Sequence, residues 1–106
     1  MVRRGTTPTL ALLVKHHDLS GCAIFVTVRQ KSNISTKTGD DIMMAYEEEE
    51  GTMLTVTLTQ EETLALGEGT ANVQVRWINS EGVAKATNVE MLDIKKILLE
   101  EVISFG

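Results

Sequence analysis

The regular alternation in Thr52–Thr59, "TMLTVTLT", constrains the fold more than any other part of the chain. Side chains of a β-strand point alternately to its two faces, so Leu54, Val56 and Leu58 share one face and the threonines lie on the other. This pattern predicts a strand with one face in water and one against a core. A strand of this kind needs a second layer of structure to cover its apolar side.

Similar apolar stretches recur along the chain, separated by turn signals roughly every 8–12 residues. We expect strands within Thr9–Lys15, Cys22–Arg29, Lys31–Lys37 (an edge strand), Asp40–Tyr46, Thr52–Thr59, Thr70–Asn79 and Val83–Asn88, and a last strand from Val89 to about residue 95. Aromatic residues make up only 4% of the chain, so the core must be mainly aliphatic. Val73, Val75 and Trp77 share one face of their strand and are expected to lie in that core.

These seven or eight strands predict an all-β fold, an antiparallel β-sandwich of immunoglobulin-like shape. The Cys…Trp…Cys spacing of antibody domains is absent, because Cys22 is the only cysteine. A chain of 106 residues has room for one domain, so residues 1–106 are interpreted as a single β-sandwich domain. The lone cysteine also excludes an internal disulfide.

The alternation stops at Thr59, where helix signals begin. Thr59 and Glu62 have the spacing of a capping box, in which each side chain accepts a hydrogen bond from the backbone N–H of the other residue. Gly67 and Gly69 predict an early helix end. We therefore expect one short helical turn near residues 60–66, which carries the chain from one sheet to the other. Leu64 and Leu66 would close the open end of the core.

The last segment of the chain has two interpretations. Ile94, Ile97 and Leu98 fit one face of a helix, but the same residues could extend a strand. We predict a strand to about residue 95, followed by a short mobile or docking tail over residues 96–106.

Several functional classes find no support in the sequence. The net charge of −5 disfavours a nucleic-acid partner, and no apolar run reaches the roughly 18 residues of a membrane span. His16 and His17 are adjacent, so in a strand they would point apart and could not share a metal ion. The acidic groups on either side of the Asp40–Tyr46 strand would lie about 20 Å apart. We expect no enzyme activity, no metal site and no cofactor.

Three stretches together resemble a known family. They are "RRGTTPTL" (Arg3 to Leu10), "VTLTQEETLAL" (Val56 to Leu66), and "VQVRW" followed by Glu81-Gly82 and a strand of small residues. The chain resembles small proteins encoded in the tail regions of phages and prophages of Gram-positive gut bacteria. It is also similar to the N-terminal β-sandwich domain of phage baseplate upper proteins. "KHHDLS" and "YEEEEG" depart from the family pattern in expected loops.

The resemblance implies a non-enzymatic tail or baseplate component, or an assembly module. Such a protein would dock to other phage tail or baseplate proteins or form a homo-oligomer. It would reside in the bacterial cytoplasm during assembly and then in the virion. The expected docking residues are Arg3, Arg4, Thr6, Thr7, Lys95 and Lys96. The alternative is a carbohydrate-binding sandwich that aids host attachment, for which an exposed Trp77 would be the ligand platform.

Overall fold

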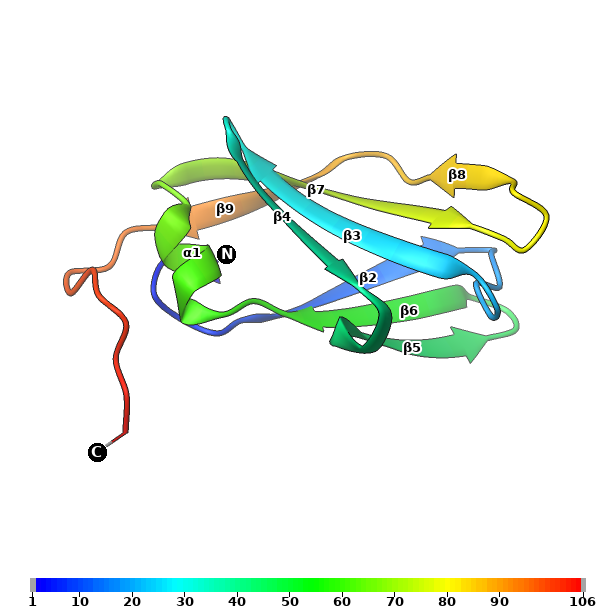
Figure 1. The fold of residues 1–106 in the computed structure, drawn as a ribbon, viewed down its shortest axis with the longest axis horizontal. Coiled ribbons are helices and arrows are strands. Elements are labelled where there is room, and N and C mark those ends of the chain that lie inside the picture. The colour runs from blue at the N-terminus through cyan, green and yellow to red at the C-terminus, as the bar shows by residue number, and fades with distance from the viewer. Residues whose placement is uncertain (1, 106) are drawn as a thin grey trace.

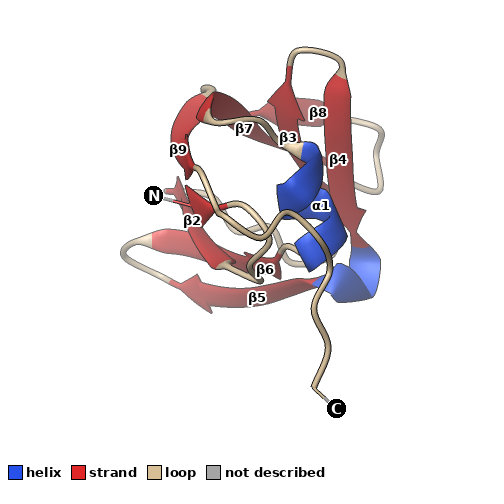
Figure 2. Ribbon diagram, turned by 90° about the vertical axis from the view of Figure 1, so that its left-hand side faces the viewer, coloured by secondary structure: helices blue, strands red, loops and turns tan. Residues whose placement is uncertain are grey.

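The larger of two sheets is mixed and curls around one side of the core in the computed structural model, which describes residues 2–105 (Figures 1 and 2). Its strand order is β1-β9-β7-β3-β4, and β8 pairs with β7 outside this path. The strands are β1 (Val2–Arg3), β3 (Ala23–Gln30), β4 (Asn33–Thr38), β7 (Gly69–Ile78), β8 (Ala84–Ala86) and β9 (Glu90–Lys95). All pairs are antiparallel except β1 with β9.

The smaller sheet is antiparallel and has the order β2-β6-β5. Its strands are β2 (Thr9–Lys15), β5 (Ile42–Glu47) and β6 (Gly51–Thr57), so β2 and β5 are its two edges. In the described residues, a 3-10 helix and an α-helix each carry the chain from one sheet to the other; the α-helix is labelled in Figure 1. The 3-10 helix η1 (Gly39–Asp41) joins β4 to β5, and the α-helix α1 (Gln60–Ala65) joins β6 to β7.

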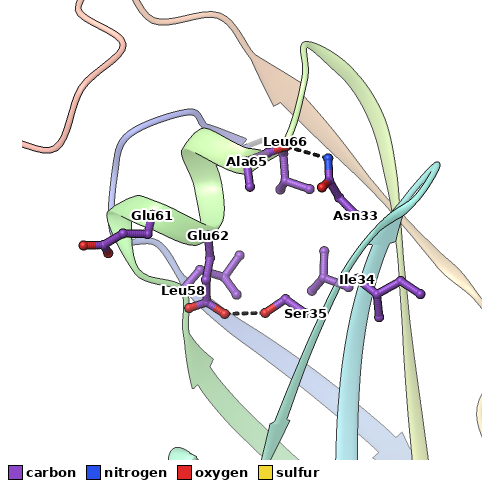
Figure 3. A pocket seen from close by; sticks show the side chains of 9 residues that line it. Asn33, Ile34, Ser35, Leu58, Glu61, Glu62, Ala65 and Leu66 are labelled. Carbon is purple, nitrogen blue, oxygen red and sulfur yellow. Dashed lines mark hydrogen bonds between the residues drawn. The ribbon is translucent and has the colours of Figure 1, made fainter.

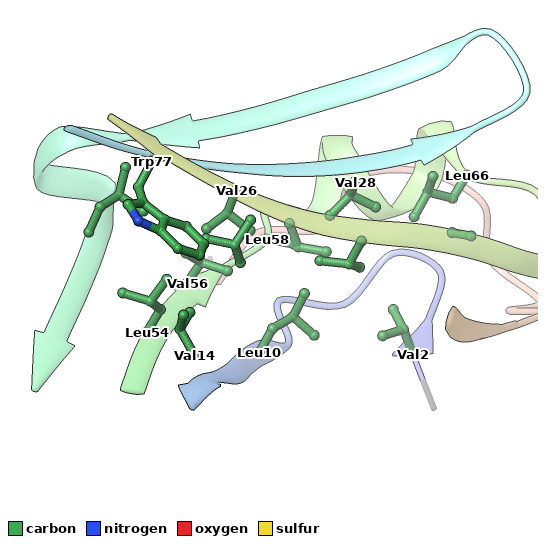
Figure 4. Packing of buried hydrophobic residues seen from close by; sticks show 14 of the residues in the cluster. Val2, Leu10, Val14, Val26, Val28, Leu54, Val56, Leu58, Leu66 and Trp77 are labelled. Carbon is green, nitrogen blue, oxygen red and sulfur yellow. The ribbon is translucent and has the colours of Figure 1, made fainter. Parts of the chain in front are cut away.

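The core lies between the facing sides of the two sheets (Figure 4). Leu54, Val56 and Leu58 are buried, as their alternation predicts, and so are Val73 and Val75 of the opposite sheet. Most other core members are also aliphatic: Val2, Leu10, Val14, Leu19, Ile24, Val26, Val28, Leu66, Ala71 and Ile94. The shortage of aromatic residues is therefore met by branched aliphatic side chains, which pack well between pleated sheets.

The mainly β fold and its short helix confirm the coarse prediction, but the fully antiparallel sandwich of seven to eight strands is wrong. The described residues contain nine strands, and β1 runs parallel to β9. This pairing places Val2 in the core at 3% exposure, which gives the two-residue strand a hydrophobic reason to form. The predicted strand over Val83–Asn88 shrinks to β8, and the one over Asp40–Tyr46 begins only at Ile42 because η1 precedes it.

Gly51 begins β6 after the acidic turn of the β5–β6 hairpin. Its φ is +122°, and a Cβ there would lie 2.2 Å from the backbone oxygen of Val14 and 2.8 Å from the backbone nitrogen of His16. Real Cβ atoms do not approach backbone atoms this closely. Only glycine fits, because the neighbouring strand β2 passes directly against this position.

Candidate functional site

Most of the expected docking residues lie at one end of the molecule, where α1, the segment Arg3–Thr7 and the chain after β9 meet. We call this region the helix end (Figures 1 and 2). The parallel pairing of β1 and β9 places Arg3 opposite Lys95. Arg4 donates its backbone N–H to the Lys95 carbonyl at 3.0 Å, and Arg3 Nη1 donates to the Lys96 carbonyl at 3.2 Å. The sequence therefore identified residues from both ends of the described chain that the fold brings together.

Arg4 is bonded within the molecule rather than free for a partner. Its side chain is only 19% exposed. Its Nη2 donates to the carbonyl of Leu64 in α1 at 2.8 Å, and its Nη1 pairs with the carboxylate of Glu100. The Nε atom is buried and has no hydrogen-bond partner among residues 2–105. Arg4 therefore links the N-terminal segment, the helix and the tail.

The loop between β1 and β2 is also fixed against the helix. Thr63 is fully buried and donates its hydroxyl to the Thr6 carbonyl at 2.8 Å, while Thr6 Oγ1 donates to the Arg3 carbonyl at 2.6 Å. Gly5 has a φ of +74°, and a Cβ on it would lie 3.3 Å from Cδ2 of Leu64. In contrast, Thr7 remains exposed to solvent.

Lys95 and Lys96 are exposed at the same end. The Nζ atom of Lys95 lies 3.1 Å from the carboxylate of its neighbour Asp93, and both side chains are well solvated. Such an exposed ion pair contributes little to stability and is easily exchanged for another partner. Arg3, Thr7, Lys95 and Lys96 therefore form the solvent-facing part of the predicted docking set, whereas Arg4 forms its structural part.

The tail after β9 has no regular secondary structure in its described part, residues 96–105. Its contacts to the rest of the molecule include the bond from Arg3 to the Lys96 carbonyl, the pairing of Glu100 with Arg4, and bonds between the Gln60 side chain and the backbone of Ile103. Gln60 Nε2 donates to the Ile103 carbonyl at 2.9 Å, and the Ile103 N–H donates to Gln60 Oε1 at 2.8 Å. The tail exposes a run of large apolar side chains: Leu98, Leu99, Val102, Ile103 and Phe105.

A cleft of about 270 Å³ lies beside the helix, between α1 and β4 (Figure 3). Val28, Leu58 and Leu66 are the buried apolar members of its lining. The tip of the β3–β4 hairpin is held over the helix end by Asn33, whose Nδ2 donates to the Ala65 carbonyl at 2.7 Å. Gln30 completes this attachment, exchanging two hydrogen bonds with the backbone of Gly67.

Glu62 lies at the edge of the cleft and completes the predicted capping box. Thr59 Oγ1 accepts from the Glu62 N–H at 3.1 Å, and Glu62 Oε1 accepts from the Thr59 N–H at 2.8 Å. The carboxylate also accepts from Ser35 and, at 2.6 Å, from Lys37 Nζ. Partial burial alone would raise the pKa of Glu62, but the hydrogen bonds from Lys37, Ser35 and Thr59 outweigh it and hold that pKa at about 2. The carboxylate is thus ionised and fully engaged near neutral pH.

Trp77 lies in the core, as its register with Val73 and Val75 predicts, and the alternative of an exposed platform is wrong. It is 7% exposed, and its ring centroid lies 5.3 Å from that of His17 (Figure 4). Among residues 2–105, no cluster of three or more His, Cys, Asp and Glu side chains has the arrangement of a metal site.

Sequence reasoning missed the contacts made by Gln60, Asn33 and Ser35. Each depends on residues at least 27 positions away, so no local pattern indicates it. The only available signal was the capping box, which placed the helix but not its neighbours.

Comparisons with protein-family models, with curated proteins and with solved structures found no match in any of the three. No helix in the described part of the chain is long and apolar enough to span a membrane.

Proposed function

We propose that this protein is a non-enzymatic structural component of a phage or prophage, a tail or baseplate protein or an assembly module. It acts by docking to other tail or baseplate proteins or to further copies of itself. It accumulates in the bacterial cytoplasm during assembly and is then part of the virion. The phage setting rests on the resemblance of "RRGTTPTL", "VTLTQEETLAL" and "VQVRW" to tail-region proteins.

The exposed apolar tail is the observation that carries the docking proposal. Leu98 is 90% exposed, and four more large apolar side chains of the tail are open to solvent. A run of exposed apolar side chains in so short a segment is characteristic of an interaction surface. Lys95 and Lys96 precede this apolar run in the chain, so exposed cationic groups lie on its N-terminal side at the helix end.

The finer fold assignment, an immunoglobulin-like sandwich, is part of this proposal. In that fold one sheet contains strands B-E-D, and the other contains G-F-C, extended by C′ in the variable type. Lettered in chain order, β2, β5 and β6 correspond to B, D and E, and β3, β4, β7 and β9 to C, C′, F and G. The observed orders β2-β6-β5 and β9-β7-β3-β4 support this correspondence. A crystal structure with β5 hydrogen-bonded into the larger sheet would contradict it.

The alternatives have less support from the contacts. An acid–base catalyst needs a pKa near the working pH, whereas Glu62 has its pKa at about 2 and is bonded to three neighbours. The glycan alternative depends on Trp77 as its platform, and Trp77 lies in the core. The docking function is therefore preferred to both.

Mass determination in solution tests the proposal directly. We would measure the protein by light scattering alone and after mixing with each tail protein encoded beside it. We expect a defined oligomer or complex that is lost in the double variant L98S/L99S. The matched control is I34S, which removes an exposed apolar side chain from β4, away from the tail. A monomer that forms no complex at high micromolar concentration would refute the proposal.

A further inference from the structure

Strand β5 is an open edge of the smaller sheet. It pairs with β6 on one side only, from Ile42 opposite Val56 to Glu47 opposite Gly51. In an antiparallel ladder every second residue directs its N–H and C=O away from the paired neighbour. In the described part of the chain, the backbone of Met43–Tyr46 makes no hydrogen bond to a segment other than β6. The outer groups of this strand therefore remain available for another strand.

Apart from Glu47, the side chains of β5 are apolar or aromatic, and those of Met43–Tyr46 are exposed on both faces of the strand. Met43 is 71% exposed on the outer face, and Ala45 is exposed beside it. Met44 and Tyr46 point to the inner face, yet both remain partly exposed because β5 is at the edge. Proteins usually protect such an edge with lysine, proline or a β-bulge. The sequence "IMMAYE" contains neither lysine nor proline, and its register with β6 has no bulge.

The β4 edge of the larger sheet differs in both respects. Its sequence "NISTKT" is polar apart from Ile34. Asn33, Ser35 and Lys37 are all bonded to α1 or its end, so the helix covers that side of the strand. Strand addition is therefore favoured at β5 and disfavoured at β4.

Acidic groups flank the apolar strand at both ends. Asp40 and Asp41 precede β5, and Glu47–Glu50 end it and form the hairpin turn. None of these six carboxylates belongs to an ion pair with another group in residues 2–105. Lys15 occupies the same cross-strand row as Glu47 but lies on the opposite edge strand, β2. The edge thus presents an apolar centre between two negative ends.

This charge pattern disfavours a second copy as the partner. If two β5 strands paired antiparallel about Met44, Asp41 would lie opposite Glu47 and Asp40 opposite Glu48 of the other copy. Like charges directly opposite each other destabilise a strand pair. A parallel pair in register would also place acidic ends side by side. A partner with basic ends complements the same pattern.

We propose that β5 binds an extended segment of another protein, with an apolar β-branched centre and basic residues at both ends, as a fourth strand of the smaller sheet. A cleft of about 220 Å³ beside Ile42 and Met44, walled in part by Cys22 and Ile24, would accept an inward apolar side chain of this segment. Main-chain hydrogen bonds supply affinity in such strand addition, and the flanking charges supply specificity. The inference goes beyond the docking proposed for the tail, since it concerns another surface and another partner chemistry.

The experiment uses the full chain and capped synthetic peptides. The probe is Lys-Lys-Ile-Thr-Val-Thr-Ile-Lys-Lys, and the controls replace its lysines by glutamates or N-methylate its alternate backbone nitrogens. Calorimetry would measure affinity, and hydrogen exchange would locate the site. Of the two charged peptides, we expect only the lysine peptide to bind. Its binding should be weakened by salt and should slow the hydrogen exchange of β5 amides. N-methylation should abolish binding in one of its two alternating patterns.

Protein variants assign the binding to β5. M43K places a lysine on the exposed edge and should weaken binding of the lysine peptide at least tenfold. I34K adds the same charge to β4 and should weaken this binding much less. D41N/E47Q should weaken it about fivefold, because exposed charge pairs are each worth a fraction of a kcal/mol. Equal effects of M43K and I34K, equal binding of both charged peptides, or protection outside β5 would overturn the proposal. So would a dimer that pairs through β5 in the absence of peptide.

Discussion

The helix end and the β5 edge differ in how their polar groups are hydrogen-bonded. At the helix end, side chains of Arg4, Gln60 and Glu62 bond to segments that are distant in sequence. Along β5, the outward backbone groups have no bonding partner in residues 2–105, and the apolar side chains face water. The first region uses its polar groups to fix the shape of the molecule. The second retains groups that another molecule can use, so the two regions should respond differently to the same kind of mutation.

Truncation of one large apolar side chain to alanine in each region should give the largest difference in the free energy of unfolding. Leu66 is 5% exposed in the core, so L66A should lower the free energy of unfolding by about 2–4 kcal/mol through lost burial and a cavity. M43A removes a side chain that is 71% exposed and should change it by less than about 0.5 kcal/mol. Urea unfolding monitored by tryptophan fluorescence measures both. Similar losses for the two variants would mean that β5 is covered in solution.

Acid should weaken the helix end through Glu62. Its pKa is lowered to about 2 in the folded protein, so its contribution is present above the unfolded-state pKa, near 4.5, and is lost as pH falls toward 2. Because the group keeps some contact with water, we expect a loss of about 1–2 kcal/mol across this window. Unfolding midpoints in urea at a series of pH values measure the effect.

Two variants distinguish the titration of Glu62 from other effects of acid on stability. E62Q should flatten the profile in this window, because the titrating group is gone. E61Q removes a charge from the same helical turn without touching Lys37 or Ser35, and its profile should keep the wild-type slope. A flattened profile in E61Q and an unchanged one in E62Q would exclude the assignment.

Loss of the Thr59 helix cap should lower the free energy of unfolding by less than L66A or the protonation of Glu62 does. T59A removes the acceptor for the Glu62 N–H, and N-cap replacements of this kind cost about 1 kcal/mol. T59S keeps the hydroxyl and should restore most of the stability. Thermal unfolding followed by circular dichroism compares the three proteins. Equal destabilisation by alanine and serine would show that the methyl group, rather than the cap, matters.

The smallest expected effect on stability is that of Q60A. It removes two hydrogen bonds between the helix and the tail at an exposed position, so stability should change by about 0.5 kcal/mol or less. Exchange of the Ile103 amide should nevertheless become faster, because its acceptor is lost. E61A, next to it on the helix, is the matched control and should leave that amide unchanged. An unaltered Ile103 exchange rate in Q60A would contradict the contact.

Local patterns predicted much of the fold and little of the site. The inward set Leu54, Val56 and Leu58 and the Thr59 cap follow from period two and from capping spacing, and both are confirmed. The pairing of Val2–Arg3 with β9 was not predicted, because two residues carry no periodicity and the partner lies more than 90 positions away. The hydrogen bonds from Arg4 to Leu64 and from Gln60 to Ile103 were not predicted either, because their partners are also distant in sequence.

The β5 edge shows a different limit. Its apolar sequence predicted a strand, but whether a strand lies in the centre or at the edge of a sheet depends on the order of strands. That order follows from the crossovers through η1 and α1 and not from the residues of β5 themselves. The sequence therefore indicated which side chains lie in this strand and left open whether a partner could reach them.

Gly51 gives the β5–β6 hairpin a fixed orientation. Because the Val14 oxygen occupies the space that any larger residue would need, sliding β6 by one position would force Thr52 or Glu50 into that space. Such a slide would also turn every side chain of the hairpin to the opposite side of the sheet. An incoming strand would thus always meet Met43 and Ala45 on the same side, so one glycine, which touches no partner, would determine in which orientation a partner can be recognised.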